Sequence, residues 1–142
     1  MQLRTFLATA SLALCAASAQ ASDFINVLTG GTSGVYYPLG VSLTQIYSKA
    51  MPDVKTSVQA TKASAENLNL LQAGRGEIAF TLADTLSEAW KGNADVGFKA
   101  PLKKLRAVAA IYPNYIHFVA AADSGIKTLA DLKGKRVSVG AP

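Results

Sequence analysis

The sequence has 142 residues, half of them hydrophobic, and a formal net charge of +5 from 14 Lys and Arg against 9 Asp and Glu. The basic residues are scattered, with small clusters only at 103–106 and 133–136, so the dense basic stripe of a nucleic-acid-binding protein is missing and we expect no nucleic-acid partner. A single cysteine, Cys15, and a single histidine, His117, exclude metal centres built from cysteines or paired histidines.

The N-terminus has the pattern of a signal peptide. Residues 1–4 form a short positive region, residues 6–17 are apolar or small, and Ala19-Gln20-Ala21 has the small-x-small pattern of a signal peptidase site. The apolar run is too short to span a bilayer as a stable helix. We therefore expect an exported protein.

A lipoprotein signal is the alternative, since Cys15 follows an apolar run, but the large Leu14 stands where a lipobox has a small residue. We expect residues 1–21 to be a signal peptide cleaved after Ala21, and residues 22–142 to be a periplasmic domain. Because cleavage removes Cys15, the stability of this domain must come from its core and not from a disulfide.

Short strand and helix patterns alternate along the first half of the domain. The apolar run Phe24–Leu28 predicts a strand, and residues 36–51 carry apolar side chains at helical spacing. Residues 56–60 predict a second strand, 64–73 a second helix and 77–82 a third strand.

The alternation continues to the end of the sequence. It predicts a short helix at 85–90, a loop at 93–101, strands at 105–111 and 116–121 separated by a turn at 112–115, a short helix at 128–132 and a last strand at 136–139. Strands that alternate with helices and are apolar on both faces predict an α/β fold, a mostly parallel sheet flanked by helices on both sides. Ligands of such sheets bind at the carboxyl ends of the strands, where the loop 29–38 lies.

This loop reads TGGTSGVYYP and has three candidate chemistries. A P-loop is excluded because no Lys-Ser or Lys-Thr pair follows the glycines, and the glycine spacing does not match a dinucleotide fingerprint, so we expect no cofactor. An anion cradle fits best, with free N–H groups at a helix start, hydroxyls from Thr32 and Ser33, and walls from Tyr36 and Tyr37. A plain turn whose two tyrosines pack in the core stays open.

Five segments carry a resemblance to a known family. They are LTGGTSGVYYPLG at 28–40, ATKASAENLNLLQAG at 60–74, EIAF at 77–80 followed by Asp84, LRAVAAIYP at 105–113 and LADLKGKRVSVG at 129–140. The first four resemble motifs of the TAXI family, the extracytoplasmic solute receptors of TRAP transporters, and the last resembles a segment shared by several periplasmic binding proteins. One departure is Lys62-Ala63, where the family usually has Gly-Gly.

The resemblance implies a type II periplasmic-binding-protein fold of two α/β lobes, with residues 22–142 as the N-terminal lobe and the second lobe incomplete in this chain. It implies a monomeric receptor that captures a small anionic solute, such as glutamate, a related amino acid or an organic acid, and delivers it to the TRAP permease subunits. For the ligand site we predict no metal and no catalytic residue. The predicted cradle is Thr32, Ser33 and Gly34, and the predicted wall is Tyr36 and Tyr37. Further predicted contacts are Asn67, Thr81 and Asp84.

Two other classes of protein stay open. The last motif also fits the solute-binding protein of an ATP-driven importer, for a pyrimidine precursor or a sulfonate. An exported hydrolase would need Ser33 as nucleophile and His117 as base, but the spacing around Ser33 is not a G-x-S-x-G elbow. We therefore expect no enzyme, and we expect His117 to be a core residue of its strand.

Overall fold

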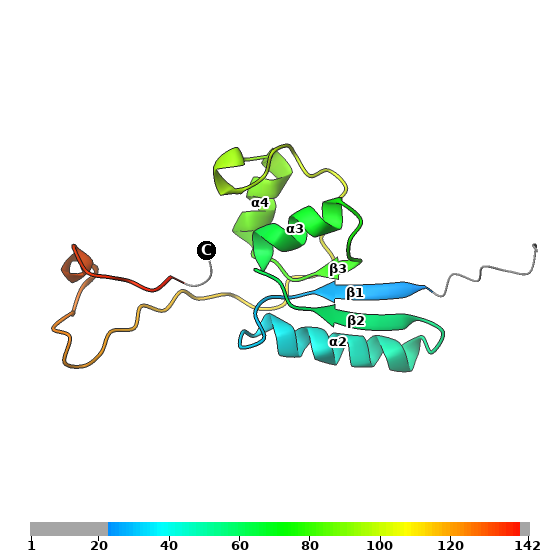
Figure 1. Cartoon of the computed structure of the whole chain (residues 1–142), viewed down its shortest axis with the longest axis horizontal. Coiled ribbons are helices and arrows are strands. Elements are labelled where there is room, and N and C mark those ends of the chain that lie inside the picture. The colour runs from blue at the N-terminus through cyan, green and yellow to red at the C-terminus, as the bar shows by residue number, and fades with distance from the viewer. Residues whose placement is uncertain (1–22, 140–142) are drawn as a thin grey trace, which may run out of the picture.

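The structure is a computed structural model that describes residues 23–139; the predicted signal peptide lies outside the described residues. Its centre is a parallel sheet in the order β2–β1–β3, built from β1 (Phe24–Leu28), β2 (Lys55–Gln59) and β3 (Ile78–Ala79) (Figure 1). β2 pairs with β1 over its full length, whereas β3 pairs with it only at Val27 and Leu28. The predicted α/β class with a parallel sheet is confirmed.

Three helices follow the three strands, namely α2 (Tyr36–Ala50), α3 (Ser64–Gln72) and α4 (Ala83–Lys91). β2 lies on one side of β1 in the sheet, and β3 lies on the other side. The connection from β1 to β2 therefore runs in the opposite direction to the connection from β2 to β3. Because such crossovers are right-handed, α2 and α3 lie on opposite faces of the sheet (Figure 1). Two 3-10 turns complete the structure, η1 (Ala94–Val96) and η2 (Leu129–Leu132). Between residues 23 and 139, no helix combines the length and the apolar character needed to cross a bilayer.

The core has two parts. Val27 and Leu28 of β1 are completely buried in the sheet, and α2 lies so close to this strand that a methyl group added at Gly40 would come within 2.5 Å of the Thr29 side chain. The second part lies between α3, α4 and the loop after them. Its buried members are Leu68, Ala89, Phe98, Leu102 and Leu105.

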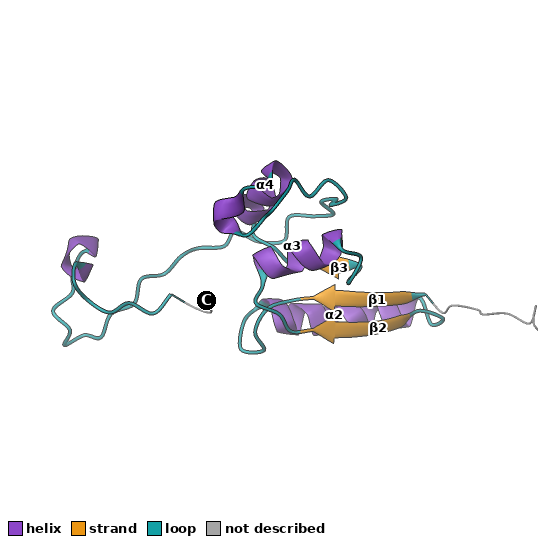
Figure 2. Ribbon diagram, turned by 45° about the horizontal axis from the view of Figure 1, so that its top comes forward, coloured by secondary structure: helices purple, strands orange, loops and turns teal. Residues whose placement is uncertain are grey.

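The structure corrects the sequence prediction beyond Leu105. The segments 105–111, 116–121 and 136–139, which were predicted as strands, are extended chain without a pairing strand, and the predicted strand 77–82 is reduced to Ile78–Ala79 (Figure 2). Val108 and Val119 are 90% and 91% exposed, and His117 is exposed and not in a core. An apolar, β-branched run favours burial in a sheet, but a strand forms only where a neighbour supplies its hydrogen bonds, and among the described residues no strand pairs with these segments.

Asn67 of α3 ties together the carboxyl ends of the strands. Its side chain is completely buried, and its Nδ2 donates to the backbone oxygens of Thr29, just after β1, at 2.6 Å and of Phe80, just after β3, at 2.8 Å. The hydroxyl of Thr61, which follows β2, donates to Asn67 Oδ1 at 2.6 Å. One carboxamide therefore joins the segments that follow all three strands.

Replacing Asn67 with alanine should lower the free energy of unfolding by about 3 kcal/mol, because it leaves the buried carbonyl of Phe80 without its donor, leaves that of Thr29 with only the Thr61 hydroxyl as a side-chain donor, and opens a cavity. Urea denaturation measures this change. Asn69→Ala is the matched control in the same helix, since the exposed Asn69 amide donates mainly to Ala65 one turn earlier and its loss should cost less than about 1 kcal/mol. Equal losses in the two variants would contradict the role given to Asn67.

Candidate functional site

Three helix N-termini meet at one edge of the sheet. The strands are parallel and each is followed by a loop and a helix, so α2, α3 and α4 all begin near the carboxyl ends of the strands (Figure 1). The first N–H groups of a helix have no partner within the helix, and they carry the partial positive charge of the helix dipole. This edge of the sheet therefore presents several hydrogen-bond donors to one region.

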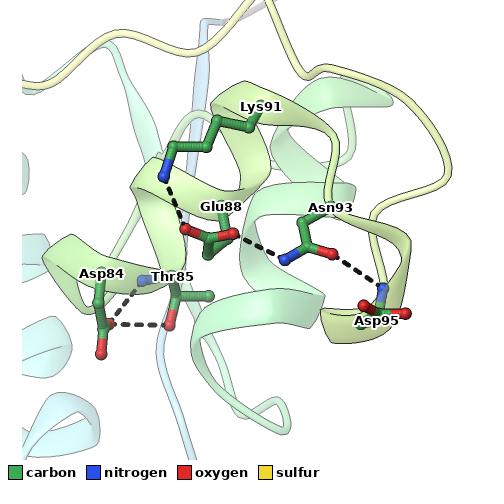
Figure 3. Close-up of polar contacts among 6 residues, drawn as sticks. All are labelled: Asp84, Thr85, Glu88, Lys91, Asn93 and Asp95. Atoms are coloured by element: carbon green, nitrogen blue, oxygen red, sulfur yellow. Dashed lines mark hydrogen bonds and ion pairs between the residues drawn. The ribbon is translucent and has the colours of Figure 1, made fainter.

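The three helices have no side-chain cap. Their N-cap residues are Val35, Ala63 and Leu82, none of which accepts a capping hydrogen bond. The short 3-10 turn η1 does have such a partner, because the Asn93 side chain accepts from the N–H of Asp95 (Figure 3). Ser, Thr, Asp and Asn are the usual N-cap residues, so the helix starts at the sheet edge lack a feature that this chain uses elsewhere.

Acidic residues distinguish the three helix starts from one another. The first turn of α2 has none. In α3, the Glu66 carboxylate accepts from the backbone N–H of Lys62 at 2.6 Å, and in α4 the Asp84 carboxylate accepts from the backbone N–H and the hydroxyl of Thr85 (Figure 3). The first turn of α2 therefore adds no negative side chain of its own to the partial positive charge of the helix dipole. In the part of the chain that the structure describes, no three His, Cys, Asp or Glu side chains form a group that could hold a metal ion.

A pocket of about 320 Å³ lies against these helix starts. It is lined by Gly30, Gly31, Gly34, Val35, Tyr36, Ala63, Ser64, Leu82, Tyr112 and Asn114. The glycine loop is closed as a tight turn in which the N–H of Gly34 donates to the oxygen of Gly31 at 2.9 Å. A side chain added at Gly31 would meet nothing within 4 Å, because this residue borders the open space of the pocket.

Tyr36 is held in place on one wall of the pocket. Its ring stacks on Phe80 with the centroids 5.3 Å apart. Burial raises the pKa of Tyr36, the nearby phenol of Tyr112 and the carboxylate of Asp84 raise it further, and a hydrogen bond with Ser64 opposes them. The Tyr36 hydroxyl therefore stays protonated at neutral pH and presents a donor at the pocket.

The turn before α3 is strained. Ala63 has φ 67° and ψ −144°, a conformation that favours glycine, and it is the non-glycine residue with positive φ among those described. Its N–H donates to the Thr61 hydroxyl at 2.9 Å. The next residue, Ser64, accepts from the backbone N–H of Leu82 at 3.0 Å and so connects the start of α3 to the start of α4. The strained turn thus sets the position of two helix starts.

Two of the five residues predicted on the glycine loop line the pocket, namely Gly34 and Tyr36. Thr32 and Ser33 lie on the exposed tip of the loop, outside the pocket lining, and Tyr37 is half-buried beside it. The N–H of Gly34 is used inside the loop and is not a free donor at the pocket.

The three predicted residues beyond the loop lie near the pocket but do not line it. Asn67 is buried with its amide bonded inside the protein. Thr81 is half-buried, and its hydroxyl donates to the oxygen of Leu82 at 3.2 Å. Asp84 is exposed in the first turn of α4. In this structure they position the helix starts, and their contact with a solute stays a prediction.

The structure adds pocket residues that the site prediction did not include: Gly30, Gly31, Val35, Ala63, Ser64, Leu82, Tyr112 and Asn114. Ser64 and Leu82 could have been found from the sequence, because they stand where a helix begins after a strand, as Tyr36 does. Tyr112 and Asn114 reach the pocket through the path of the chain after Arg106, which no local pattern predicts.

A larger hollow, about 620 Å³, lies on the outer side of α4. Its wall is mainly apolar and includes Leu86, Trp90 and Leu105, with Lys103 lying 4.1 Å from the centre of the Trp90 ring. None of the residues at the start of α2 lines this hollow. We therefore take the smaller pocket at the sheet edge as the candidate site.

The parallel sheet flanked by helices is compatible with part of a type II lobe of a periplasmic solute-binding protein. The family profile of the NMT1-like family matches residues 27–142. The chain belongs to the NMT1-like family, whose members are periplasmic solute-binding proteins. The class predicted from the sequence, an extracytoplasmic solute-binding protein, is confirmed at this level.

Ala63→Gly should raise the free energy of unfolding by about 1 kcal/mol, because glycine adopts the positive φ at this position without strain. Thermal or urea denaturation measures the change. Ala50→Gly, at the exposed end of α2, is the control and should lower stability by up to about 1 kcal/mol. If both substitutions destabilise alike, the turn at Ala63 is not strained.

Tyr36 should make stability depend on pH in the alkaline range. The folded state raises its pKa above the ordinary value of 10.0, so its contribution is complete below about pH 10 and is lost as the pH rises through the folded pKa. The parent protein should lose more stability between pH 9 and pH 11 than Tyr36→Phe does. Tyr115→Phe, at a phenol that is 73% exposed, should follow the parent, and identical pH profiles of all three proteins would refute the assignment.

Proposed function

We propose that this protein is the extracytoplasmic receptor of a TAXI-type TRAP transporter. It captures a small anionic solute, such as glutamate, a related amino acid or an organic acid, and delivers it as a monomer to the membrane permease subunits. The observation that carries the proposal is the meeting at one pocket of three helix N-termini whose N-cap residues make no capping hydrogen bond, since such ends bind anions through backbone N–H groups.

The pocket supplies the contacts that a carboxylate needs. The start of α2 offers donors without an acidic residue in its first turn, and the Tyr36 hydroxyl stands beside Ser64 on the wall. Hydrogen bonds to a charged acceptor are the stronger class, worth about 1.5–3 kcal/mol each. A small carboxylate therefore satisfies donors that the protein leaves uncapped.

The proposal that the receptor is of the TAXI type rests on the segments at 28–40 and 60–74. These segments contain the glycine loop and the pocket residues Tyr36, Ala63 and Ser64. The rival, a receptor for an ATP-driven importer, fits the same family and the same pocket. The energy source of uptake separates them. Reconstitution with its membrane permease should give uptake driven by an ion gradient without ATP, and uptake that requires ATP would favour the rival.

Catalysis is not part of the proposal. A hydrolase needs a nucleophile with a base in reach, and neither Ser33 nor His117 is among the residues that line the pocket. We further propose that the receptor acts in the periplasm after cleavage behind Ala21. The mass of the exported chain would show this cleavage directly.

Acetate and acetamide test the proposed site, because they have nearly the same shape and differ in charge. In titrations of the 15N-labelled protein, acetate should shift the backbone amide signals of Gly31, Tyr36 and Ser64 and bind at least about ten-fold more tightly than acetamide. Tyr36→Phe should weaken acetate binding by roughly five-fold or more if the phenol donates. Tyr47→Phe, near the other end of the same helix, should leave it unchanged.

Equal binding of acetate and acetamide would count against an anion site. Shifts confined to exposed lysines would show that acetate binds by surface charge alone, and this result would also contradict the proposal. Melting temperatures of both variants confirm that they remain folded.

A further inference from the structure

We propose that the α4 groove, the hollow lined by α4 and residues 103–107, is a docking site for an acidic segment of a partner protein. An apolar side chain of that segment lies in the groove, and its carboxylates bind Arg106 and Lys103. The inference goes beyond the proposed function and does not depend on it, because the groove, of about 620 Å³, shares no lining residue with the pocket at the sheet edge.

The two walls of the groove come from a helix and from the chain that follows it. Leu86 and Trp90 stand four residues apart on α4 and therefore share one face of the helix. The buried Leu105 belongs to the opposite wall. Both walls thus offer apolar surface to a side chain that enters between them.

Hydrogen bonds between the walls fix the width of the groove. The N–H of Leu102 donates to the backbone oxygen of Ala89 at 2.9 Å, and Lys103 Nζ donates to the backbone oxygen of Trp90 at 2.8 Å. A groove that is already formed loses little conformational freedom when a partner binds. It is therefore suited to binding a short segment.

The charges along the groove all have one sign. Its lining contains Lys91, Lys103 and Arg106 and neither Asp nor Glu. The Lys91 ammonium pairs with Glu88 at 2.9 Å (Figure 3), whereas between residues 23 and 139 no carboxylate forms an ion pair with Lys103 or Arg106. Two positive charges are left for a partner, and an acidic segment complements them.

Arg106 is oriented for a carboxylate. Its Nη1 donates to the backbone oxygens of Lys103 at 3.0 Å and of Leu105 at 2.7 Å, and these two bonds hold the guanidinium plane. Among the described residues, Nε and Nη2 have no acceptor. Two parallel N–H groups of this kind match the two oxygens of one carboxylate.

Trp90 provides the apolar anchor point. It is the single tryptophan of the chain and is 45% exposed, and Lys103 lies 4.1 Å from the centre of its ring. Tryptophan and arginine are the residues that most often dominate binding at protein interfaces. The partner segment therefore needs an apolar side chain next to its acidic residues.

The shape of the surface favours a peptide over an anionic membrane. A lipid surface is broad and does not enter a groove between a helix and a chain segment, whereas one side chain of a peptide does. The helical wall has nine residues, which span about 12 Å. This length matches roughly four residues of extended peptide.

Three capped peptides separate the two parts of the surface. Glu-Glu-Phe-Glu-Glu should bind at low ionic strength at least about ten-fold more tightly than Gln-Gln-Phe-Gln-Gln, which lacks the carboxylates, or Glu-Glu-Ala-Glu-Glu, which lacks the anchor. The fluorescence of the single tryptophan, Trp90, reports binding at the groove directly. If either control peptide binds as tightly as the first, the proposal is overturned.

Arg106→Gln should weaken binding of Glu-Glu-Phe-Glu-Glu by about ten-fold, because it removes the charged donors of the guanidinium. Arg75→Gln removes the same charge at an exposed site outside the groove lining and should change the affinity by less than about two-fold. Equal weakening in both variants would show that only net charge acts, and would contradict the proposal.

A second variant tests the groove by adding a charge. Ser87→Glu places a carboxylate at an exposed position of the lining and should weaken binding of the acidic peptide by about five-fold. Ser42→Glu, at an exposed position of α2, is the matched control and should leave the affinity unchanged. Melting temperatures show that each variant is folded, and a folded Ser87→Glu protein that binds like the parent would overturn the assignment.

Vesicles distinguish a peptide partner from a membrane. Phosphatidylcholine vesicles, with or without phosphatidylserine, should leave the emission of Trp90 unchanged. If the anionic vesicles shift this emission and Glu-Glu-Phe-Glu-Glu does not, the groove binds lipid and the proposed protein partner is wrong.

Discussion

The buried carboxamide of Asn67 is the interaction on which the rest of the structure depends. β3 pairs with β1 at only two residues, too few to fix its position by ladder hydrogen bonds alone. Asn67 donates to the backbone just after both of these strands and accepts from Thr61 beyond β2. A fully satisfied buried amide fixes one arrangement, because any other leaves polar groups unpaired. The loops that end the three strands, and therefore the three helix starts, are held in register by one side chain.

The three helix starts at the sheet edge lack features that usually stabilise a helix end. N-cap side chains usually stabilise a helix by about 1 kcal/mol, yet Val35, Ala63 and Leu82 supply none. Ala63 adds a positive φ that costs a non-glycine residue of the order of 1–3 kcal/mol. Unmet donors and backbone strain at the same edge are typical of a binding site, where the missing partners are supplied by a ligand. The buried core residues Leu28 and Leu68 lie on the elements that carry this edge.

The sequence predicted most of what local patterns determine. The strand 24–28 and the helices after it follow from apolar spacing, and the glycine loop was placed at the carboxyl edge because parallel α/β sheets share that geometry. The apolar runs at 105–111, 116–121 and 136–139 were wrongly predicted as strands, since a pattern records the preference of a segment and not the presence of a partner strand. His117 was misplaced for the same reason. Tyr112 and Asn114 could not be assigned to the pocket, because the route of the chain from Arg106 onward is a tertiary property.

The most direct test of the central claim, that helix N-termini hold the carboxylate of a solute, is a crystal structure of the protein with bromoacetate, whose bromine can be located by anomalous scattering. The account predicts the bromoacetate in the pocket beside Tyr36 and Ser64, with its carboxylate within hydrogen-bond distance of backbone N–H groups at the starts of α2 and α3. Bromoacetate found instead at basic side chains such as Lys103 and Arg106, with the pocket at the sheet edge empty, would contradict it.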